Sequence, residues 1–469
     1  MVNEKYIMPV TLCLGLLVTA CNVTSKGKKS PVNDKPNIVF IYSDDWGYED
    51  LGIHGSTFCK TPNLDKMADQ GMDFQNFSVC NPVCSPSRTA IMTGHFPARH
   101  SIHGHFATVQ SQIQRGMPDW LDPGEVMLPR LLQEAGYTTA HYGKWHLSNT
   151  HVPDGPSPLE YGYDEYDAFN LSSQFSQMSA DSTMTRTLNF IEKNKEKPFF
   201  VNVWIHAVHT PHYPKENFLA QFPELNEQQK VYAAVIAEAD FQIGLLFAKL
   251  KELGLDEKTL VIFSSDNGPE NTGNEKHKYS EDNSTGPGLS SYYSVGETNG
   301  LKGRKRSLFA GGVRVPFIVR WPGVVPSGII DKTTPLAAVD MLPTFVELAG
   351  GTLPENYKPD GESIVSAIKG ESYERQSVIY WQWLSANKRT DFWPSLGIQD
   401  GEWKLLVNRD FNRLELYNTN TDWAEQTDLA AQNPDKVKEL EAKLDAWVLT
   451  LPANPPANCI SSERKNLGN

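Results

Sequence analysis

Short runs of β-branched and aromatic residues alternate with longer stretches of helical period from residue 36 onward. These runs predict strands over residues 38–42, 138–142, 199–205, 260–263 and 317–321. Helices are predicted over residues 128–134 and 227–253, and Gly254 occupies the position that commonly ends a helix. The alternation predicts an α/β fold in which a large, mostly parallel sheet is covered by helices on both faces.

The pattern changes near Ser377 to shorter strand-like runs, over residues 378–383 and 403–407. A helix is predicted over residues 435–447, because its apolar positions recur on one helical face. We therefore predict a main domain over residues 36–376 and a smaller α+β subdomain with an antiparallel sheet over residues 377–469. Residues 271–299 are rich in Gly, Ser, Asn and Thr, and are either a mobile surface loop or one wall of a substrate pocket.

The amino terminus has the features of a bacterial export signal. Residues 8–20 are apolar but too short to span a bilayer comfortably, and Lys5 precedes them. The stretch ends Val18-Thr19-Ala20-Cys21, which resembles a lipobox. We expect a signal peptide over residues 1–21, a lipid anchor at Cys21 and a polar tether over residues 22–35. The protein would then be exported to the periplasm or cell envelope; the alternative is a buried terminal element with an incidental cysteine.

The overall charge narrows the choice of partners. The chain has 469 residues, with 43 Lys and Arg against 56 Asp and Glu, which gives a net charge of -13. A nucleic-acid partner is not expected, because neutralising phosphates needs clustered basic residues. Small molecules or carbohydrates are the better candidates. Beyond the leader, the cysteines at positions 59, 80, 84 and 459 show no disulfide pattern.

Polar clusters follow four of the predicted strands. Asp44-Asp45 follows the first, residues 143–146 the second, residues 206–209 the third and residues 266–268 the fourth. Since ligands in open α/β sheets bind beyond the carboxyl ends of the strands, these clusters are expected at one rim. The oxygens of Asp44, Asp45, Asp266 and Asn267 suit Ca²⁺ or Mg²⁺ and not zinc. A solvated turn or helix cap is the alternative for any single pair.

Residues 80–94 contain the most specific local pattern. Prolines before and just inside a predicted helix start aim Cys84 and the first-turn amides at one point, which favours an anion site. The residue types alone allow Cys84 to be a thiolate nucleophile or a buried apolar residue.

The run Cys-Ser-Pro-Ser-Arg-Thr-Ala-Ile-Met-Thr-Gly over residues 84–94 resembles the signature C-x-P-S-R-x-x-x-x-T-G of the type I, formylglycine-dependent sulfatases. Further motifs similar to that family lie at residues 36–39, 44–48, 143–147, 265–268, 311–316, 340–344, 360–363 and 416–418. The resemblance implies an alkaline-phosphatase-like α/β sandwich and a sulfuric ester hydrolase. The exported lipoprotein setting resembles glycan-degrading systems, which adds sulfated carbohydrate as the expected substrate.

The same resemblance implies roles for individual residues. A maturation enzyme would convert Cys84 to formylglycine, and the hydrate of that group would be the nucleophile. Asp44, Asp45, Asp266 and Asn267 would bind a metal together with residue 84, with Ca²⁺ favoured over Mg²⁺. Arg88 would orient the hydrate, Lys144 and Lys305 would hold sulfate oxygens, His209 would protonate the leaving oxygen, and His146 would remove the second hydroxyl proton. The sequence departs from the family at Ala310, where an acidic residue usually stands.

Several assignments stay open at this point. His103 and His105 are candidates for substrate binding, although isolated histidines are more often structural. Trp381, Trp383 and Trp393 are candidates for sugar stacking, with core packing the favoured interpretation. The alternative functions are a phosphate or phosphonate monoester hydrolase of the same superfamily, and a glycan-binding lipoprotein without catalysis.

Overall fold

The first of the described strands lies in the middle of the main sheet. The computed structural model describes residues 1, 35–148, 151–170, 179–210, 212–270, 294–384 and 394–467. Within it, β1 (Asn37–Ser43) pairs in parallel with β6 (Phe199–Trp204) on one side and β7 (Thr259–Ser265) on the other. All of the residues of these three strands are buried, as expected for a sheet covered on both faces.

The main sheet has eight strands in the order β5-β4-β6-β1-β7-β8-β2-β9. Its remaining strands are β5 (Glu165–Phe169), β4 (Thr138–Lys144), β8 (Phe317–Arg320), β2 (Met72–Phe74) and β9 (Ile329–Asp331). The strands from β5 to β7 run parallel, whereas β8 is antiparallel to both of its neighbours. The shorter β3 (Phe77–Ser78) and β10 (Leu336–Ala337) form a separate parallel pair.

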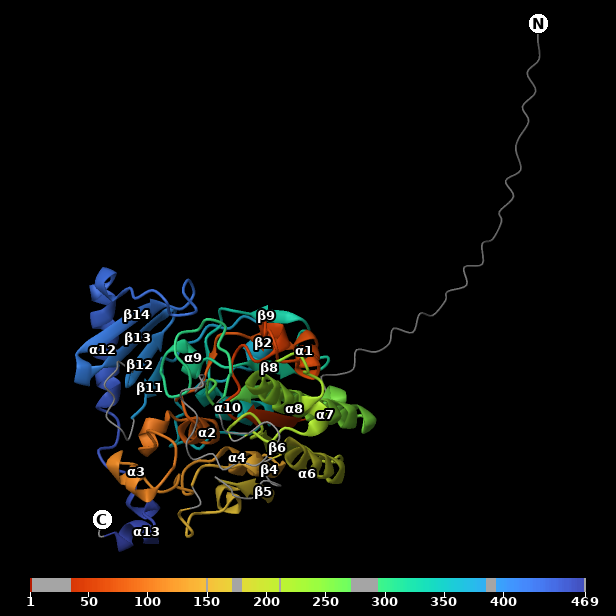
Figure 1. Ribbon diagram of the computed structural model, residues 1–469, viewed down its shortest axis with the longest axis horizontal. Helices are drawn as coiled ribbons and strands as arrows, with labels where there is room; N and C mark the ends of the chain where they lie inside the picture. Colours follow the sequence, from red (N-terminus) through yellow and green to blue (C-terminus); the bar gives the residue numbers. More distant parts are fainter. Residues whose placement is uncertain are drawn as a thin grey trace. The chain divides into compact units, whose positions relative to one another are not determined.

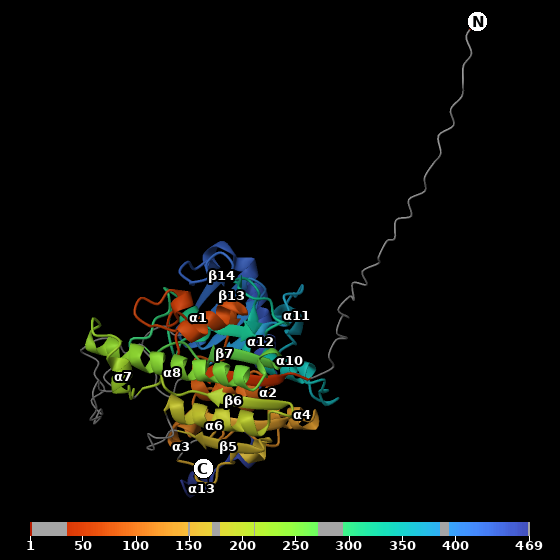
Figure 2. The same cartoon turned by 90° about the vertical axis from the view of Figure 1, so that its right-hand side faces the viewer.

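Helices cover both faces of this sheet, as Figures 1 and 2 show. Alternate side chains of β1 belong to two different hydrophobic clusters. One cluster joins β1 to α2 (Cys84–Thr93), α4 (Leu128–Glu134) and α10 (Met341–Leu348). The other joins it to α1 (Pro62–Asp69), α6 (Ala180–Lys193) and α8 (Glu227–Glu252). The core is therefore two layers of packing, one on each side of the sheet.

A second, antiparallel sheet follows in the last quarter of the chain (Figure 1). Its strands are β11 (Ile379–Gln382), β12 (Leu396–Asp400), β13 (Trp403–Asn408) and β14 (Arg413–Asn418). Helix α12 (Pro434–Val448) packs against it through Val437, Leu440, Leu444 and Trp447, the positions that the helical period predicted. The short helices are α3 (Val109–Gln114), α7 (Glu216–Leu219), α9 (Ala310–Val313), α11 (Val365–Ile368) and α13 (Ser462–Asn466).

The predicted fold class is confirmed: a large, mostly parallel sheet flanked by helices, with a C-terminal antiparallel sheet. The predicted boundary at residue 376 stays a prediction, since residues 35–469 form one compact unit. The leader, the tether and Cys21 lie outside the described residues. Helix α8 is long and apolar enough to cross a membrane, but most of its apolar stretch is buried against the sheet and neighbouring helices, as in a core helix of a soluble domain.

A buried histidine in this core links stability to pH. His141 on β4 meets the rings of Trp145 and Trp204 edge-on at 4.9 and 4.7 Å, and burial lowers its pKa to about 3. In the unfolded chain the imidazole pKa is about 6.5, so between these two values only the unfolded state gains the proton and stability falls as pH falls. We expect this residue alone to cost about 2 kcal/mol of unfolding free energy between pH 7 and pH 5. Urea unfolding at both pH values should show a smaller loss in His141→Phe, and equal losses would contradict the assignment.

Candidate functional site

The carboxyl ends of β1 and β7 bring four predicted ligands together. Asp44 and Asp45 follow β1, Asp266 and Asn267 follow β7, and all four are 0% exposed. Asp45 adopts a left-handed backbone with φ 60°, and its N–H donates to Asp266 Oδ1 at 3.2 Å. Asn267 Nδ2 donates to Asp45 Oδ1 at 2.7 Å. Two strand ends separated by more than 200 residues in the chain therefore build one buried oxygen cluster.

Helix α2 adds Cys84 to this cluster. The helix begins at Cys84, after Val83 in extended conformation, and all of its residues are buried. The Cys84 Sγ lies 3.3 Å from Asp44 Oδ1 and 3.2 Å from Lys144 Nζ. One ligand atom each from Asp44, Asp45, Cys84 and His209 lie within 4.8 Å of one another. Cys84 is thus placed at the point toward which the strand ends converge.

Three buried cations compensate the three aspartates. Lys144 Nζ lies 2.6 Å from Asp44 Oδ2, and Lys305 Nζ lies 2.6 Å from Asp45 Oδ2. Arg88 donates from Nη2 and Nε to Asp266 Oδ2 at 2.6 and 3.1 Å, and from Nη1 to the Lys144 carbonyl. Its guanidinium lies 4.8 Å from the centre of the Trp204 ring. Arg88 therefore holds Asp266 and the end of β4 in place.

Burial and neighbouring charges give the carboxyl and thiol groups of the cluster different pKa values. Burial, together with Asp44, raises the pKa of Asp266 to about 7, whereas for Asp44 burial is outweighed by Lys144 and two histidines, so its pKa is well below the usual range. Burial, with Asp266 and Asp44 adding to it, also raises the pKa of the Cys84 thiol. The unmodified cysteine is therefore protonated at neutral pH. This weakens the thiolate alternative, since the thiolate is the nucleophilic form.

The donor set fits a hard divalent cation. Its donors are carboxylate and amide oxygens, which Ca²⁺ and Mg²⁺ prefer. The buried Asn267 Oδ1 has no hydrogen-bond partner among the described residues, although buried acceptors are normally satisfied. An ion beside Asp44, Asp45 and Asp266 would satisfy it and replace the protons that burial favours on two of the carboxylates.

Two stacked histidines close one side of the cluster. His209 Nε2 lies 3.8 Å from Asp45 Oδ2, and its ring stacks on His206 with centroids 4.7 Å apart. His206 Nδ1 lies 2.5 Å from Asp44 Oδ2. The resemblance to the family implied a role for His209 only, although His206 belongs to the same polar cluster after the third predicted strand. The three-residue spacing of the two histidines was the signal that could have found it.

His146 lies beside the segment that carries the two substrate-binding candidates, His103 and His105. His146 has φ 54°, and its Nε2 donates to the Phe106 carbonyl at 2.8 Å. Its buried Nδ1 has no partner among the described residues, so in this tautomer it keeps a free lone pair. The His105 ring lies 6.4 Å from that of His146, and His103 is held through its carbonyl by Leu384 N–H.

The model of the family described as Sulfatase matches residues 36–351. The chain belongs to the sulfatase family. A second model, described as N-sulphoglucosamine sulphohydrolase, C-terminal, matches residues 302–452. The predicted family membership is therefore confirmed.

Named relatives place the chain among enzymes of this family. The N-acetylgalactosamine-6-sulfatase of Canis lupus familiaris is 31% identical, with 78% of this chain and 72% of the relative covered. The N-acetylgalactosamine-6-O-sulfatase of Bacteroides thetaiotaomicron is 25% identical, with 95% and 99% covered. The crystal structure of Ps i-CgsB in complex with k-i-k-neocarrahexaose matches with a TM-score of 0.74 at 29% identity and covers 91% of this chain and 96% of that one. The chain is a sulfuric ester hydrolase, as predicted.

Ala310 stands where the sulfatase pattern has an acidic residue, and a residue from the C-terminal part of the chain supplies a carboxylate at this place. Ala310 N–H donates to Glu425 Oε2 at 2.7 Å. Lys404 Nζ donates to Glu425 Oε1 at 2.6 Å and to the Leu308 carbonyl at 2.9 Å. Glu425 is 0% and Lys404 is 3% exposed. A carboxylate is therefore present beside Ala310, a few residues after Lys305.

This buried pair gives a testable stability effect. Glu425→Ala leaves the buried Lys404 ammonium without its counter-charge and the Ala310 N–H without its acceptor, and breaking a buried pair in this way costs about 3–5 kcal/mol. We expect guanidinium unfolding to show that loss, and the double variant Glu425→Ala/Lys404→Met to recover most of it. Lys443→Ala, which removes an exposed cation from Asp400 and Glu439, serves as control and should cost about 1 kcal/mol or less. A similar loss in both single variants would contradict the expectation.

Burial decides between core packing and sugar stacking for two of the three tryptophan candidates. Trp381 is 0% exposed and donates Nε1–H to the Val79 carbonyl at 2.7 Å, and Trp383 is 6% exposed. Both pack in the core, which was the favoured interpretation. Trp393 lies outside the described residues, as do residues 271–293, so neither interpretation of that insertion is tested.

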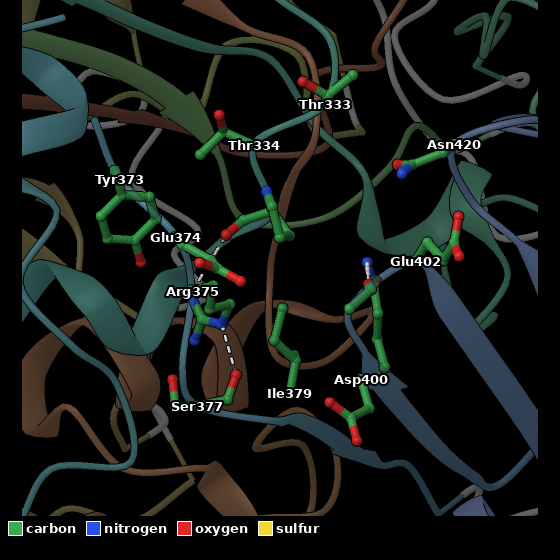
Figure 3. A pocket seen from close by; sticks show the side chains of 13 residues that line it. Thr333, Thr334, Tyr373, Glu374, Arg375, Ser377, Ile379, Asp400, Glu402 and Asn420 are labelled. Atoms are coloured by element: carbon green, nitrogen blue, oxygen red, sulfur yellow. Dashed lines mark hydrogen bonds between the residues drawn. The ribbon is translucent and has the colours of Figure 1, made fainter. Parts of the chain in front are cut away.

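A separate cavity of about 290 Å³ lies where residues 333–335 and 373–377 meet β12 and the turn that follows it (Figure 3). Its described lining contains none of the predicted site residues. Arg375 in its wall is paired with Asp340 at 2.6 Å. Its Nε donates to the Ser377 carbonyl at 2.9 Å, as the dashed line in Figure 3 shows. The Arg375 charge is compensated within the fold, so this cavity offers no free cation to a sulfate.

Proposed function

We propose that this sulfatase removes sulfate from sulfated carbohydrates, with a formylglycine formed from Cys84 as its nucleophilic residue. The observation that carries the proposal is the position of Cys84, whose Sγ lies 3.3 Å from Asp44 Oδ1 and 3.2 Å from Lys144 Nζ at the start of α2. The carbohydrate substrate is inferred from the relatives, two of which are named N-acetylgalactosamine sulfatases.

The metal and the modified residue would supply the central chemistry. A divalent cation, Ca²⁺ before Mg²⁺, held by Asp44, Asp45, Asp266, Asn267 and residue 84 would withdraw charge from a sulfate and lower the proton affinity of the nucleophile. Formylglycine, as its hydrate, would supply one hydroxyl as the nucleophile and a second hydroxyl for release of the sulfate.

The side chains of the chain itself bind the ester and move protons. Lys144 and Lys305 hold sulfate oxygens, because fixed cations in a buried site stabilise charge that shifts onto the sulfuryl group. His209 donates a proton to the leaving oxygen. Burial and the adjacent Lys305 lower the pKa of His209, so the anionic substrate must bring this residue to its protonated form. His146 accepts the proton of the second hydroxyl at Nδ1, which has no partner among the described residues and carries a lone pair when Nε2 donates to the Phe106 carbonyl.

The proposal is tested by measuring free sulfate released from sulfated galactosides, hexosamines, glycosaminoglycan fragments and algal oligosaccharides. The protein is produced with a formylglycine-generating maturation enzyme, and mass spectrometry verifies the modification at residue 84. Release from one substrate class, abolished in Cys84→Ala, is expected. If no member of the panel releases sulfate while matched phosphate or phosphonate esters are turned over, the proposal is overturned in favour of a phosphate or phosphonate monoester hydrolase. Glycan binding by both proteins without any turnover would favour a binding protein.

We also propose that the enzyme acts in the cell envelope and is anchored through a lipid on Cys21. The support is the sequence of residues 8–21 alone, since that segment lies outside the described residues. In a bacterial host, Cys21→Ser should move the protein from the membrane fraction to the soluble fraction and abolish fatty-acid labelling. An unchanged distribution would contradict the anchor.

A further inference from the structure

The segment over residues 103–106 passes directly beside the catalytic residues. The Phe106 N–H donates to the hydroxyl oxygen of Ser85, the residue after Cys84, at 3.0 Å. The Phe106 carbonyl accepts from His146 Nε2 at 2.8 Å. These two hydrogen bonds fix His105, the preceding residue, beside the entrance of α2 and beside the His146 ring.

Arg115 reaches this segment from the end of α3. Its Nε donates to the Ser111 carbonyl at 3.1 Å, and the residue is 7% exposed. Its Nη1 packs on Gly104, where an added Cβ would lie only 2.1 Å away. Glycine at position 104 permits this close approach, because a Cβ there would make the guanidinium shift. The guanidinium therefore lies against the backbone between His103 and His105.

Arg115 differs from the other cations near the site. Lys144, Lys305 and Arg306 each have a carboxylate within 4 Å, whereas Arg115 forms no ion pair with a carboxylate of the described residues. Burial lowers its pKa, with no anion offsetting it. The pKa of the half-buried His105 is lowered by desolvation and, among its charged neighbours, most by Arg115. An uncompensated buried cation is costly, and an anion bound beside it would offset that cost.

We propose that Arg115, with His105 beside it, forms a subsite for a second anionic group of the glycan, next to the sulfate ester that is hydrolysed. The inference rests on the proposed function and adds a substrate class to it: carbohydrates that carry another sulfate or a carboxylate near the scissile ester. A guanidinium suits either anion, because its planar fork donates two parallel hydrogen bonds to sulfate or carboxylate oxygens.

Three substrates with the same scissile ester test the subsite and distinguish the two anions. They are N-acetylgalactosamine 6-sulfate, N-acetylgalactosamine 4,6-disulfate, and N-acetylgalactosamine 6-sulfate joined to glucuronate. Wild type should prefer one of the last two by kcat/KM. Arg115→Met should reduce that preference about 10- to 100-fold, mainly through KM, because hydrogen bonds to a charged group are lost. Arg115→Lys should recover part of it, since the charge returns without the fork.

Arg409→Met is the matched control, since it removes one positive charge from an exposed pair with Asp445. It should leave the preference unchanged. Equal loss on all three substrates in Arg115→Met would assign Arg115 a structural role and overturn the proposal, as would an unaltered preference.

A binding measurement separates this inference from the proposed function. Calorimetry in the inactive Cys84→Ala background requires no turnover, and the added Arg115→Met change should weaken binding of the doubly anionic sugar about 10-fold or more. Unchanged affinity would overturn the subsite. Absence of sulfate release by the matured wild type from every substrate would overturn the proposed function instead, while the affinities still decide the role of Arg115.

Discussion

Cys84→Ser should produce an enzyme that stops after one turnover. The serine hydroxyl would occupy the place of the Cys84 thiol beside Asp44 and Lys144, so it can still attack sulfur. The resulting serine sulfate lacks a second hydroxyl on the same carbon and needs water to attack the sulfur, which is slower. We expect one equivalent of desulfated product per enzyme, a covalent sulfate on residue 84 by mass spectrometry, and steady-state sulfate release at least about 1000-fold below wild type.

The matched control is Cys84→Ala, which offers no nucleophile and should give neither the product burst nor the covalent sulfate. Steady release of sulfate by the serine variant would contradict the need for two hydroxyls on one carbon. Residue 84 would still be the nucleophilic residue, but the proposed route by which sulfate leaves it would be wrong.

Removal of the divalent cation should have an effect of similar size. Without it, Lys144, Lys305 and Arg88 are the permanently charged side chains that compensate the three buried aspartates, and the sulfate loses its strongest charge partner. We expect chelation followed by gel filtration to lower kcat/KM at least about 1000-fold. Added Ca²⁺ should restore activity more fully than Mg²⁺.

Asp45→Asn provides the control for this experiment. The substitution removes one ligand charge and the ion-pair partner of Lys305, so the metal should no longer restore activity. Full activity after verified metal removal, measured by elemental analysis on the same sample, would contradict the metal assignment.

The sequence predicted the strands that carry the site better than it predicted the sheet. Buried parallel strands such as β1 and β7 are continuous apolar runs, which stand out against polar neighbours. The edge strand β5 has a mixed burial pattern and was missed. The antiparallel direction of β8 depends on its pairing with β7 and β2. The residues of a single strand do not indicate in which direction it will pair.

The site residues that directly follow strands could be predicted from the sequence. The contacts made by side chains from distant segments could not. Asp44 and Asp266 meet because parallel strands end at one edge. The sequence does not show that His206 bonds to Asp44, since that depends on the side-chain direction after β6. Glu425 accepts a hydrogen bond from Ala310, which lies 115 residues away in the chain. Arg115 packs against the segment beside the site at Gly104, which has no side chain. Neither contact could be predicted from the sequence.

The central position of β1 has a consequence for the order of events during synthesis. Its partners β6 and β7 are translated long after α2, so the sheet that buries Cys84 is incomplete until residue 265 has emerged. At about 5–20 residues per second, the interval from residue 84 to residue 265 lasts about 10–40 s. Pairings between such distant segments also form slowly. In the finished protein Cys84 is 2% exposed, so an enzyme that modifies it must act before folding closes access to the thiol.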